Sequence, residues 1–390
     1  MKLEYKIVVL FFLVYSLTIS SCTQSDKPRT DTLFEKKENT GISFVNKVSN
    51  TKDFNIFSYR NFYNGGGVAL GDLNNDGLAD IFFTANMSSN KLYLNKGAFQ
   101  FDDITEKAGI SKEEQWSTGV ALVDINSDGW LDIYVCNAGF INGQAPTSKL
   151  YINNHNLTFT ESAESYGLSN KGGYATHAAF FDYDLDGDLD CFIINNSFIP
   201  VNTLNYANKR MLRAKDWPVA DYLKGGGDRF LRNDNGKFTD ISQEAGVYGS
   251  LISFGLGVTV GDINGDHYPD VYVSNDFFER DYLYINQKNG TFKDELESYM
   301  QHISHSSMGA DLSDINNDGY PDLFVTEMLP DDDYRLKTTT SFENTDVQQL
   351  KVKSGFFYQF MQNTLQVNNK DGKFSETAFY SGVAASDWSW

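Results

Sequence analysis

Acidic side chains recur at one fixed spacing in this chain, in five short segments rich in Asp, Asn and Gly. In every segment, carboxylate or amide oxygens fall at positions 1, 3, 5 and 9. Calcium takes six to eight oxygen ligands, and a flexible loop with acids at alternate positions can direct them towards one ion. The spacing therefore predicts about five Ca²⁺ sites. Their side-chain ligands would be Asp72, Asn74, Asp76 and Asp80; Asp124, Asn126, Asp128 and Asp132; Asp182, Asp184, Asp186 and Asp190; Asp262, Asn264, Asp266 and Asp270; and Asp314, Asn316, Asp318 and Asp322.

The sixth position of each loop decides how easily the chain bends around an ion. In the fourth loop His267 occupies it, which makes this loop the least favourable of the five. Magnesium is a weaker candidate because it demands strict octahedral geometry, and zinc because the loops supply no set of Cys or His ligands. In the other four loops the residue is a glycine, which permits a sharp bend: Gly77, Gly129, Gly187 and Gly319.

An ordinary polar turn is the alternative interpretation, because Asp, Asn and Gly also form turns without a metal. One such loop is ambiguous, whereas five with the same oxygen spacing favour cation binding. The composition agrees, since 52 acidic and 32 basic residues give a net charge of −20. Carboxylates packed within a few ångströms repel one another without a cation, so we expect a calcium-dependent fold. The same acidity disfavours nucleic-acid binding.

Strands are predicted to position these loops, because β-branched and aromatic residues follow position 9 in every case. An EF-hand loop would instead continue into a helix. An apolar segment with small residues precedes each loop, and an LYxN-like strand, an Asn/Gly turn and a Phe-centred strand follow it. The aromatic residue at position 11 is expected to pack between units; it is Phe82, Tyr134, Phe192, Tyr272 and Phe324 in turn.

One repeat therefore contains about four short strands and no convincing helix. Several such units in tandem predict an all-β fold of the β-propeller type. A β-sandwich is the runner-up, although a sandwich does not need the same loop in every unit. Two insertions interrupt the repeats, at about 198–227 and 328–360.

The N-terminus has the composition of a secretory signal, with Lys2 and Lys6 ahead of an apolar run. The run ends in Ile19-Ser20-Ser21-Cys22, which resembles a bacterial lipobox and implies lipidation of Cys22. We expect a signal peptide at 1–21, a tether at 22–40 and the repeats at 41–390. The mature protein would then be exported and lipid-anchored at the outer membrane or the cell surface, with no other membrane contact.

The loops, each followed by an LYxN-like strand and a Phe-centred strand, resemble the FG-GAP/VCBS repeats of integrin-α-like propellers. The segments NFYNGGGVALGD at Asn61 and SMGADLSDINND at Ser307 are similar to bacterial members of the cartilage acidic protein-like family, which often carry an ASPIC/UnbV domain. This resemblance implies about seven blades, Ca²⁺ in the inter-strand loops and a surface or secreted location. Because a lead-in segment precedes Trp390 without a sixth loop, we expect an incomplete ring in this chain.

The sequence favours a non-enzymatic scaffold for recognition of a protein or glycan. No nucleophile elbow, phosphate-binding loop or Cys–His pair is visible in it. A polysaccharide lyase or hydrolase, or an accessory lipoprotein of an outer-membrane nutrient uptake system, are the alternatives. Inserted loops on rigid scaffolds often bind ligands. The first insertion supplies an aromatic and basic candidate ligand face of Tyr206, Arg210, Arg213, Trp217 and Tyr222.

Two cysteines and one histidine lie in predicted strands. Cys136 and Cys191 follow different loops at different offsets, which places them on opposite strand faces and favours buried free thiols over a disulfide. His177 occupies a lead-in strand, where a packed core role is expected.

Overall fold

The computed structural model describes residues 34–110, 112–113, 115–139, 144–340 and 344–388. The predicted signal peptide, the lipidation site Cys22 and most of the predicted tether lie outside the described residues. A boundary between two units of the chain falls at Thr40 and Gly41, and the second unit contains every strand. Among the described residues, no helix is both long and apolar enough to cross a bilayer.

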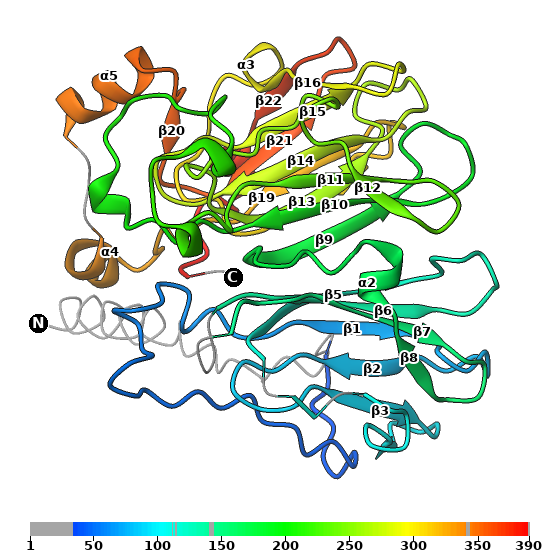
Figure 1. Ribbon diagram of the computed structural model, residues 1–390. Helices are drawn as coiled ribbons and strands as arrows, with labels where there is room; N and C mark the ends of the chain where they lie inside the picture. Colours follow the sequence, from blue (N-terminus) through cyan, green and yellow to red (C-terminus); the bar gives the residue numbers. More distant parts are fainter. Residues whose placement is uncertain (1–33, 111, 114, 140–143, 341–343, 389–390) are drawn as a thin grey trace, which may run out of the picture. The chain divides into compact units, whose positions relative to one another are not determined.

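Five four-stranded antiparallel sheets follow one another along the chain (Figure 1). The first and second contain β1 (Val68–Gly71), β2 (Asp80–Phe83), β3 (Lys91–Asn95) and β4 (Phe101–Asp103), and β5 (Ser117–Val123), β6 (Asp132–Asn137), β7 (Lys149–Asn153) and β8 (Phe159–Glu161). The third and fourth contain β9 (Ala175–Phe181), β10 (Asp190–Asn195), β11 (Arg229–Asn233) and β12 (Phe238–Asp240), and β13 (Gly255–Gly261), β14 (Asp270–Asn275), β15 (Tyr282–Asn286) and β16 (Phe292–Asp294). The fifth contains β18 (Ala310–Ser313), β19 (Asp322–Val325), β21 (Thr364–Asn368) and β22 (Phe374–Glu376).

Each sheet is a simple meander, so the predicted repeat of four short strands is confirmed. The second strand always begins at position 9 of an acidic loop. This residue pairs with the last residue of the first strand, as in Gly71↔Asp80 and Phe181↔Asp190. The acidic loops therefore connect the first and second strands of every sheet, as expected from the β-branched and aromatic residues that follow them.

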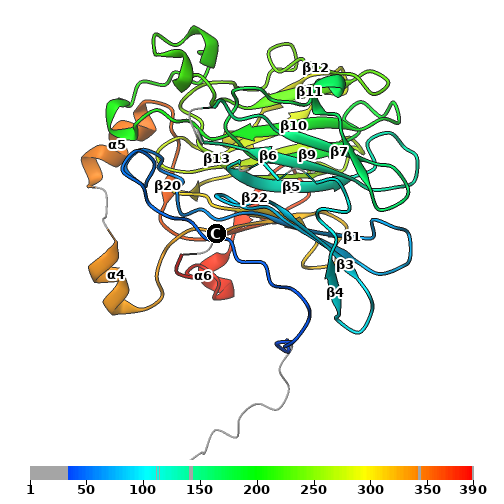
Figure 2. The ribbon, with the colours of Figure 1, turned by 60° about the horizontal axis from the view of Figure 1, so that its bottom comes forward.

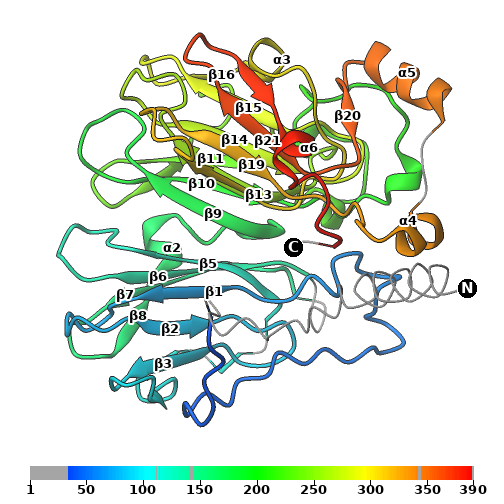
Figure 3. The same cartoon turned by 180° about the vertical axis from the view of Figure 1, so that it is seen from behind.

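The first strands of successive sheets lie side by side: β1 contacts β5, β5 contacts β9, β9 contacts β13, and β13 contacts β18. Figure 3 shows the same succession of sheets from behind. We call these five the inner strands. Apolar residues fill the space between neighbouring sheets in four clusters, each drawing on two consecutive sheets. Burying one Phe or Leu in such a cluster contributes about 1.5–3 kcal/mol, so these clusters are the main force holding the repeats together.

Four of the five aromatic residues at position 11 belong to these clusters, which confirms their predicted packing between units. Phe82, Tyr134, Phe192 and Tyr272 are at most 1% exposed, and Phe324 packs against a smaller apolar group on the fifth sheet. A ligand-binding ring stack is thereby excluded for the four buried ones.

Cys136 and Cys191 are free and buried, as predicted. However, both belong to the apolar cluster between the second and third sheets. Cys136 lies on one face of the second sheet and Cys191 lies on the opposite face of the third sheet. These two faces point towards each other across the space between the sheets, so both cysteines enter the same cluster.

The described helices are short and lie outside the sheets. The first insertion contains three 3-10 turns, η2 (Val201–Thr203), η3 (Ala214–Asp216) and η4 (Asp221–Leu223). The second contains α4 (Asp333–Thr339), α5 (Thr345–Lys353) and β20 (Gln359–Phe360), which pairs with β17 (Ile303–Ser304). The remaining helices are α2 (Ala163–Tyr166), α3 (Leu296–Tyr299) and α6 (Ala378–Ser381).

The two insertions pack against each other, which the sequence did not indicate. Residues of the first insertion share an apolar cluster with Phe356 from the second and with Phe254 and Phe278 of the fourth repeat. In Figure 2 the turns of the first insertion, α5 and β20 lie on the same side of the sheets. The observed fold is all-β and propeller-like; the total of seven blades stays a prediction.

Candidate metal centres in the acidic loops

All five acidic loops share one hydrogen-bond pattern at position 1. One carboxylate oxygen of this Asp accepts the backbone N–H of position 5, and the other accepts the N–H of position 6. The N···O distances are 2.7–3.1 Å. The first Asp therefore folds the loop back over itself. The position-1 residues are Asp72, Asp124, Asp182, Asp262 and Asp314.

The Asp at position 9 is buried in every loop and ties the loop to the sheet. Its Oδ2 accepts the N–H of position 2 at 2.9–3.2 Å. Its Oδ1 accepts the N–H of the Asn that ends the third strand, at 2.7–2.8 Å. Burial raises the pKa of Asp80, raises that of Asp132 to about 6, and raises those of Asp190 and Asp270 to about 7. Repulsion from the other acids of the loop adds to the rise, so these carboxylates need compensating positive charge.

Two positions of every loop adopt the left-handed backbone conformation. Position 4 has φ of 56–76° and position 6 has φ of 71–96°. Four loops use Gly at position 6, and the fourth loop uses His267 at φ 71°. The fourth loop thus makes the same bend as the others, with Gly265 at position 4, although the His carries a steric cost that Gly avoids.

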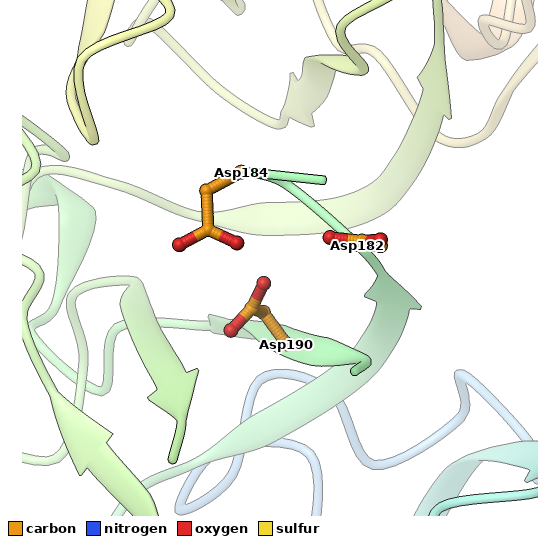
Figure 4. A group of neighbouring side chains, drawn as sticks. All are labelled: Asp182, Asp184 and Asp190. Carbon is orange, nitrogen blue, oxygen red and sulfur yellow. The ribbon is translucent and has the colours of Figure 1, made fainter. Parts of the chain in front are cut away.

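The third loop brings three carboxylates together. Asp182, Asp184 and Asp190 each offer an oxygen, and these oxygens lie within 4.8 Å of one another (Figure 4). In the first, second and fourth loops, position 3 is an Asn whose Nδ2 donates to the position-5 Asp at 2.9–3.0 Å. In the third loop, position 3 is Asp184, which has no side-chain amide to donate. Its Oδ1 is buried without a hydrogen-bond partner among the described residues. Burial, with repulsion from Asp186 and Asp182, raises the pKa of Asp184.

Side chains from the turn between the third and fourth strands lie against position 5 in three loops. His155 Nε2 lies 2.9 Å from Asp128 Oδ2, and Lys288 Nζ lies 3.3 Å from Asp266 Oδ2. In the fifth loop, Lys370 Nζ lies 3.4 Å from the equivalent oxygen of Asp318. Gly97 and Asn235 occupy this turn position in the first and third repeats, so these loops lack a cationic side chain there.

The donor set fits a hard cation. The five loops offer carboxylate, amide and carbonyl oxygens and no sulfur, and the loop side chains at positions 1, 3, 5 and 9 include no imidazole. Calcium prefers such oxygens and tolerates irregular geometry, whereas zinc prefers nitrogen and sulfur. The third loop fits best because a buried carboxylate oxygen there has no donor.

The Asn that ends the LYxN-like strand joins the acidic loops to neighbouring repeats. The sequence alone assigned this Asn no role. The third strand of every sheet ends in this Asn. The Asn side-chain amide donates to the carbonyl of loop position 8 in the same repeat. In three repeats it also donates to position 2 of the loop in the preceding repeat, at 2.8–2.9 Å: Asn153 to Leu73, Asn286 to Tyr183 and Asn368 to Ile263. Its recurrence in the LYxN motif was the signal that could have identified it.

The candidate ligand face on the first insertion is not formed as expected. Arg210 and Trp217 are buried, so the prediction that they form an exposed face is wrong. Arg210 pairs with the buried Glu279 at 2.6 Å, and Trp217 packs with Leu251 and Phe254. Apolar packing and a charge partner supplied by distant residues explain this burial, and neither is visible in the insertion itself.

The other three residues of that candidate face lie in three different environments. Tyr206 packs edge-on against Phe278, with ring centroids 5.6 Å apart. Arg213 donates from Nη1 to the carbonyl of Val247 at 2.7 Å. Tyr222 alone among the five is strongly exposed, at 59%. The five residues therefore do not share one surface.

Comparison with known sequences bears on the repeats directly. Residues 72–135, 219–273 and 262–325 match the sequence profile of the FG-GAP-like repeat. The chain contains FG-GAP-like repeats. The matched residues include the first, second, fourth and fifth acidic loops. The third loop, with its carboxylate cluster, lies between them.

Part of the chain is also similar to cartilage acidic protein 1. It is 41% identical over 78 residues to the protein of Xenopus tropicalis and 38% identical over 76 residues to that of Homo sapiens. These segments cover 20% and 19% of this chain, and 12% of the length of each relative. The resemblance to this family is confirmed over these short segments, while most of the relatives' length has no counterpart in the match.

Two solved structures resemble the fold more distantly. An Agrocybe aegerita lectin, described as recognising non-reducing terminal N-acetylglucosamine, has 15% identity and a TM-score of 0.39, covering 79% of this chain and 64% of that one. The V. cholerae biofilm matrix protein Bap1 has 14% identity and a TM-score of 0.33, covering 68% and 35%.

Proposed function

We propose that this protein is a calcium-binding scaffold that recognises a protein or glycan outside the cytoplasm and catalyses no reaction. The third acidic loop carries the proposal, because it gathers three carboxylates and leaves a buried oxygen of Asp184 without a donor in the described part of the chain. An ion bound there would supply the positive charge that this arrangement lacks. The other four loops repeat its backbone and would hold further ions.

Calcium would act on the scaffold through stability. Each acidic loop joins two strands, and in three repeats the following repeat holds the loop through an Asn side chain. An ion that binds the folded loop and not the unfolded chain stabilises the fold by mass action. We therefore expect the Tm to rise with free Ca²⁺ and to fall when a chelator removes it.

The test compares Asp184→Asn with Asp102→Asn. Asp184→Asn removes one negative charge from the third loop, while Asp102 is exposed on β4 and belongs to no acidic loop. Calcium binding is measured by isothermal titration calorimetry and by the Tm shift. We expect Asp184→Asn to weaken one class of sites and Asp102→Asn to match the wild type. Absence of any calcium-dependent heat or Tm shift in the wild type would refute the proposal.

Surface anchoring and the absence of catalysis are tested separately. Labelled palmitate should be incorporated into the wild type, and Cys22→Ser should abolish this incorporation if Cys22 is the lipidated residue. Incubation with a panel of acidic and neutral polysaccharides should give no new reducing ends and no unsaturated products. Turnover of any of them would replace the scaffold by a lyase or hydrolase.

A further inference from the structure

A cavity of about 230 Å³ lies where the inner strands of all five sheets converge. We call it the axial cavity. Each inner strand, or the residue run directly before it, contributes to the wall. The lining residues are Tyr59, Asn61, Asn64, Gly65, Gly66, Gly67, Thr118, Gly119, Thr176, His177, Leu256 and Met308.

Glycines keep this space open and the strands close. A Cβ at Gly119 would lie 2.5 Å from His177 Nδ1, and one at Gly67 would lie 2.8 Å from the carbonyl oxygen of Thr118. The threonine hydroxyls bridge neighbouring inner strands: Thr118 Oγ1 donates to Ala175 at 2.7 Å, and Thr176 Oγ1 donates to Gly255 at 2.8 Å. Close backbone approaches and threonine hydroxyls therefore hold the inner-strand part of the wall together.

A segment of the N-terminal region lines the cavity as well, and Arg60 holds it there. The Arg60 guanidinium donates to the carbonyls of Ile199 and Ser197, and its Cζ lies 4.7 Å from the centroid of the Phe254 ring. On either side of Arg60, Tyr59 and Asn61 contribute to the cavity wall. Contacts with the third and fourth repeats thus fix the wall that the segment supplies.

His177 offers hydrogen-bonding capacity that the fold does not use. Its Nδ1 is buried and has no partner among the described residues. A buried polar atom without a hydrogen-bond partner is destabilising, and a bound ligand would recover part of this cost. Burial lowers the pKa of His177, so the ring is neutral at pH 7 and carries one donor and one acceptor nitrogen. The predicted packing role of His177 therefore does not account for its buried, unpartnered Nδ1.

The residues of the cavity wall indicate the class of ligand. In a chain of net charge −20, none of the twelve lining residues is charged. Leu256, Met308 and Tyr59 supply apolar surface, while His177 and the two asparagines supply neutral donors and acceptors. A compact molecule with an apolar face and hydroxyl groups at its edges matches this mixture. The cavity, at about 230 Å³, has room for at least one sugar ring.

We propose that the axial cavity binds a neutral hydroxylated carbohydrate, through His177, Asn61 and Asn64. The inference rests on the proposed recognition function and names the class of its ligand. It does not depend on the acidic loops, since no loop residue lines the cavity.

The experiment uses the full chain with calcium and a panel of glucose, galactose, mannose and fucose, measured by saturation-transfer difference NMR. Glucuronate and glucosamine serve as charged analogues. We expect at least one neutral sugar to bind at millimolar concentration, and both charged analogues to bind at least tenfold more weakly. An oligosaccharide that ends in the binding sugar then distinguishes a free monosaccharide from a glycan terminus as the natural source.

Two variants locate the site. His177→Phe removes both ring nitrogens at similar size, and Asn64→Leu removes an amide without touching an inner strand. Either should reduce binding at least tenfold, whereas Asn202→Leu, an exposed residue in η2, should leave it unchanged. Lack of binding by every neutral sugar, equal binding of the charged analogues, or unchanged binding by folded Asn64→Leu would each overturn the inference. The calcium-dependent Tm of the same samples tests the proposed scaffold independently, so the two failures are distinguishable.

Discussion

The side-chain amide of Asn153 donates a hydrogen bond to the carbonyl oxygen of Leu73, at 2.9 Å, across the boundary between the first two sheets. Leu73 is position 2 of the first acidic loop, and Asn153 ends the third strand of the next sheet. The backbone N–H of Asn153 also binds Asp132 in its own loop, at 2.7 Å. One residue thus connects two consecutive acidic loops, and the order of one loop depends on the placement of the next.

Replacing Asn153 by Ala should lower the free energy of unfolding by about 1–3 kcal/mol, because the buried carbonyl of Leu73 and the partly buried carbonyl of Leu131 lose a donor. Urea unfolding measures the loss. The matched control is Asn233→Ala, since the Asn233 side chain donates to Leu189 within its own repeat and, among the described residues, to no loop of the preceding repeat. Equal losses for the two variants would show that the bond between repeats contributes nothing.

Replacing His267 by Gly should stabilise the protein by about 0.5–1 kcal/mol, because φ of 71° costs a side chain with a Cβ more than the added chain entropy of Gly. The His267 side chain is 93% exposed, so little packing is lost. Thermal unfolding in a chelator checks this without a contribution from bound ions. The reverse change, Gly129→His, should destabilise the second loop, and a neutral effect of both would contradict the steric argument.

Replacing Lys288 by Met should raise the calcium affinity of the fourth loop about two- to fivefold. The ammonium lies 3.3 Å from Asp266 Oδ2 and competes with the ion for this ligand, and an exposed pair of this kind is worth about 0.2–1 kcal/mol. Calorimetric titration with Ca²⁺ measures the change. Lys293→Met is the control, since Lys293 on β16 pairs with Glu295, the residue before α3, which belongs to no acidic loop. Weaker binding by Lys288→Met would show that the lysine supports the site.

Glu327 should make the protein less stable as the pH rises. It is 1% exposed, and neither carboxylate oxygen has a hydrogen-bond partner among the described residues. Burial raises its pKa to about 7, and the nearby N–H groups of Met328 and Leu329 offset only part of this rise. The unfolded chain ionises this group near its ordinary pKa, about 4.3. The contribution of the protonated Glu327 to the free energy of unfolding is therefore complete below about pH 4.3. It is lost as the pH rises through about 7, where Glu327 ionises in the folded protein.

Replacing Glu327 by Gln should remove this contribution and raise the free energy of unfolding at pH 8 more than at pH 5. Urea unfolding in a chelator at both pH values measures the difference. Glu244→Gln changes an exposed glutamate and should leave the pH profile as in the wild type. An unchanged profile for Glu327→Gln would show that the buried carboxyl does not titrate in this range.

Local features of the fold could be predicted because they depend on a few consecutive residues. The oxygen spacing, the Gly at position 6 and the β-branched residues that follow determine a tight loop between two strands, whatever surrounds it. Five repetitions of this unit then predicted tandem four-stranded sheets, since one such sheet cannot bury its apolar face alone. The position-11 aromatics were placed correctly for the same reason.

The contacts between repeats were decided by the tertiary structure alone. Which Asn reaches a neighbouring loop, how Cys136 and Cys191 come to share one cluster, and why Arg210 is buried beside Glu279 all depend on residues far apart in the chain. The axial cavity is the clearest case, because its wall combines the segment around Arg60 with residues in or directly before the inner strands of five sheets. Sequence spacing fixes what one loop or strand can do, but packing fixes which distant groups meet, and burial follows only from that meeting.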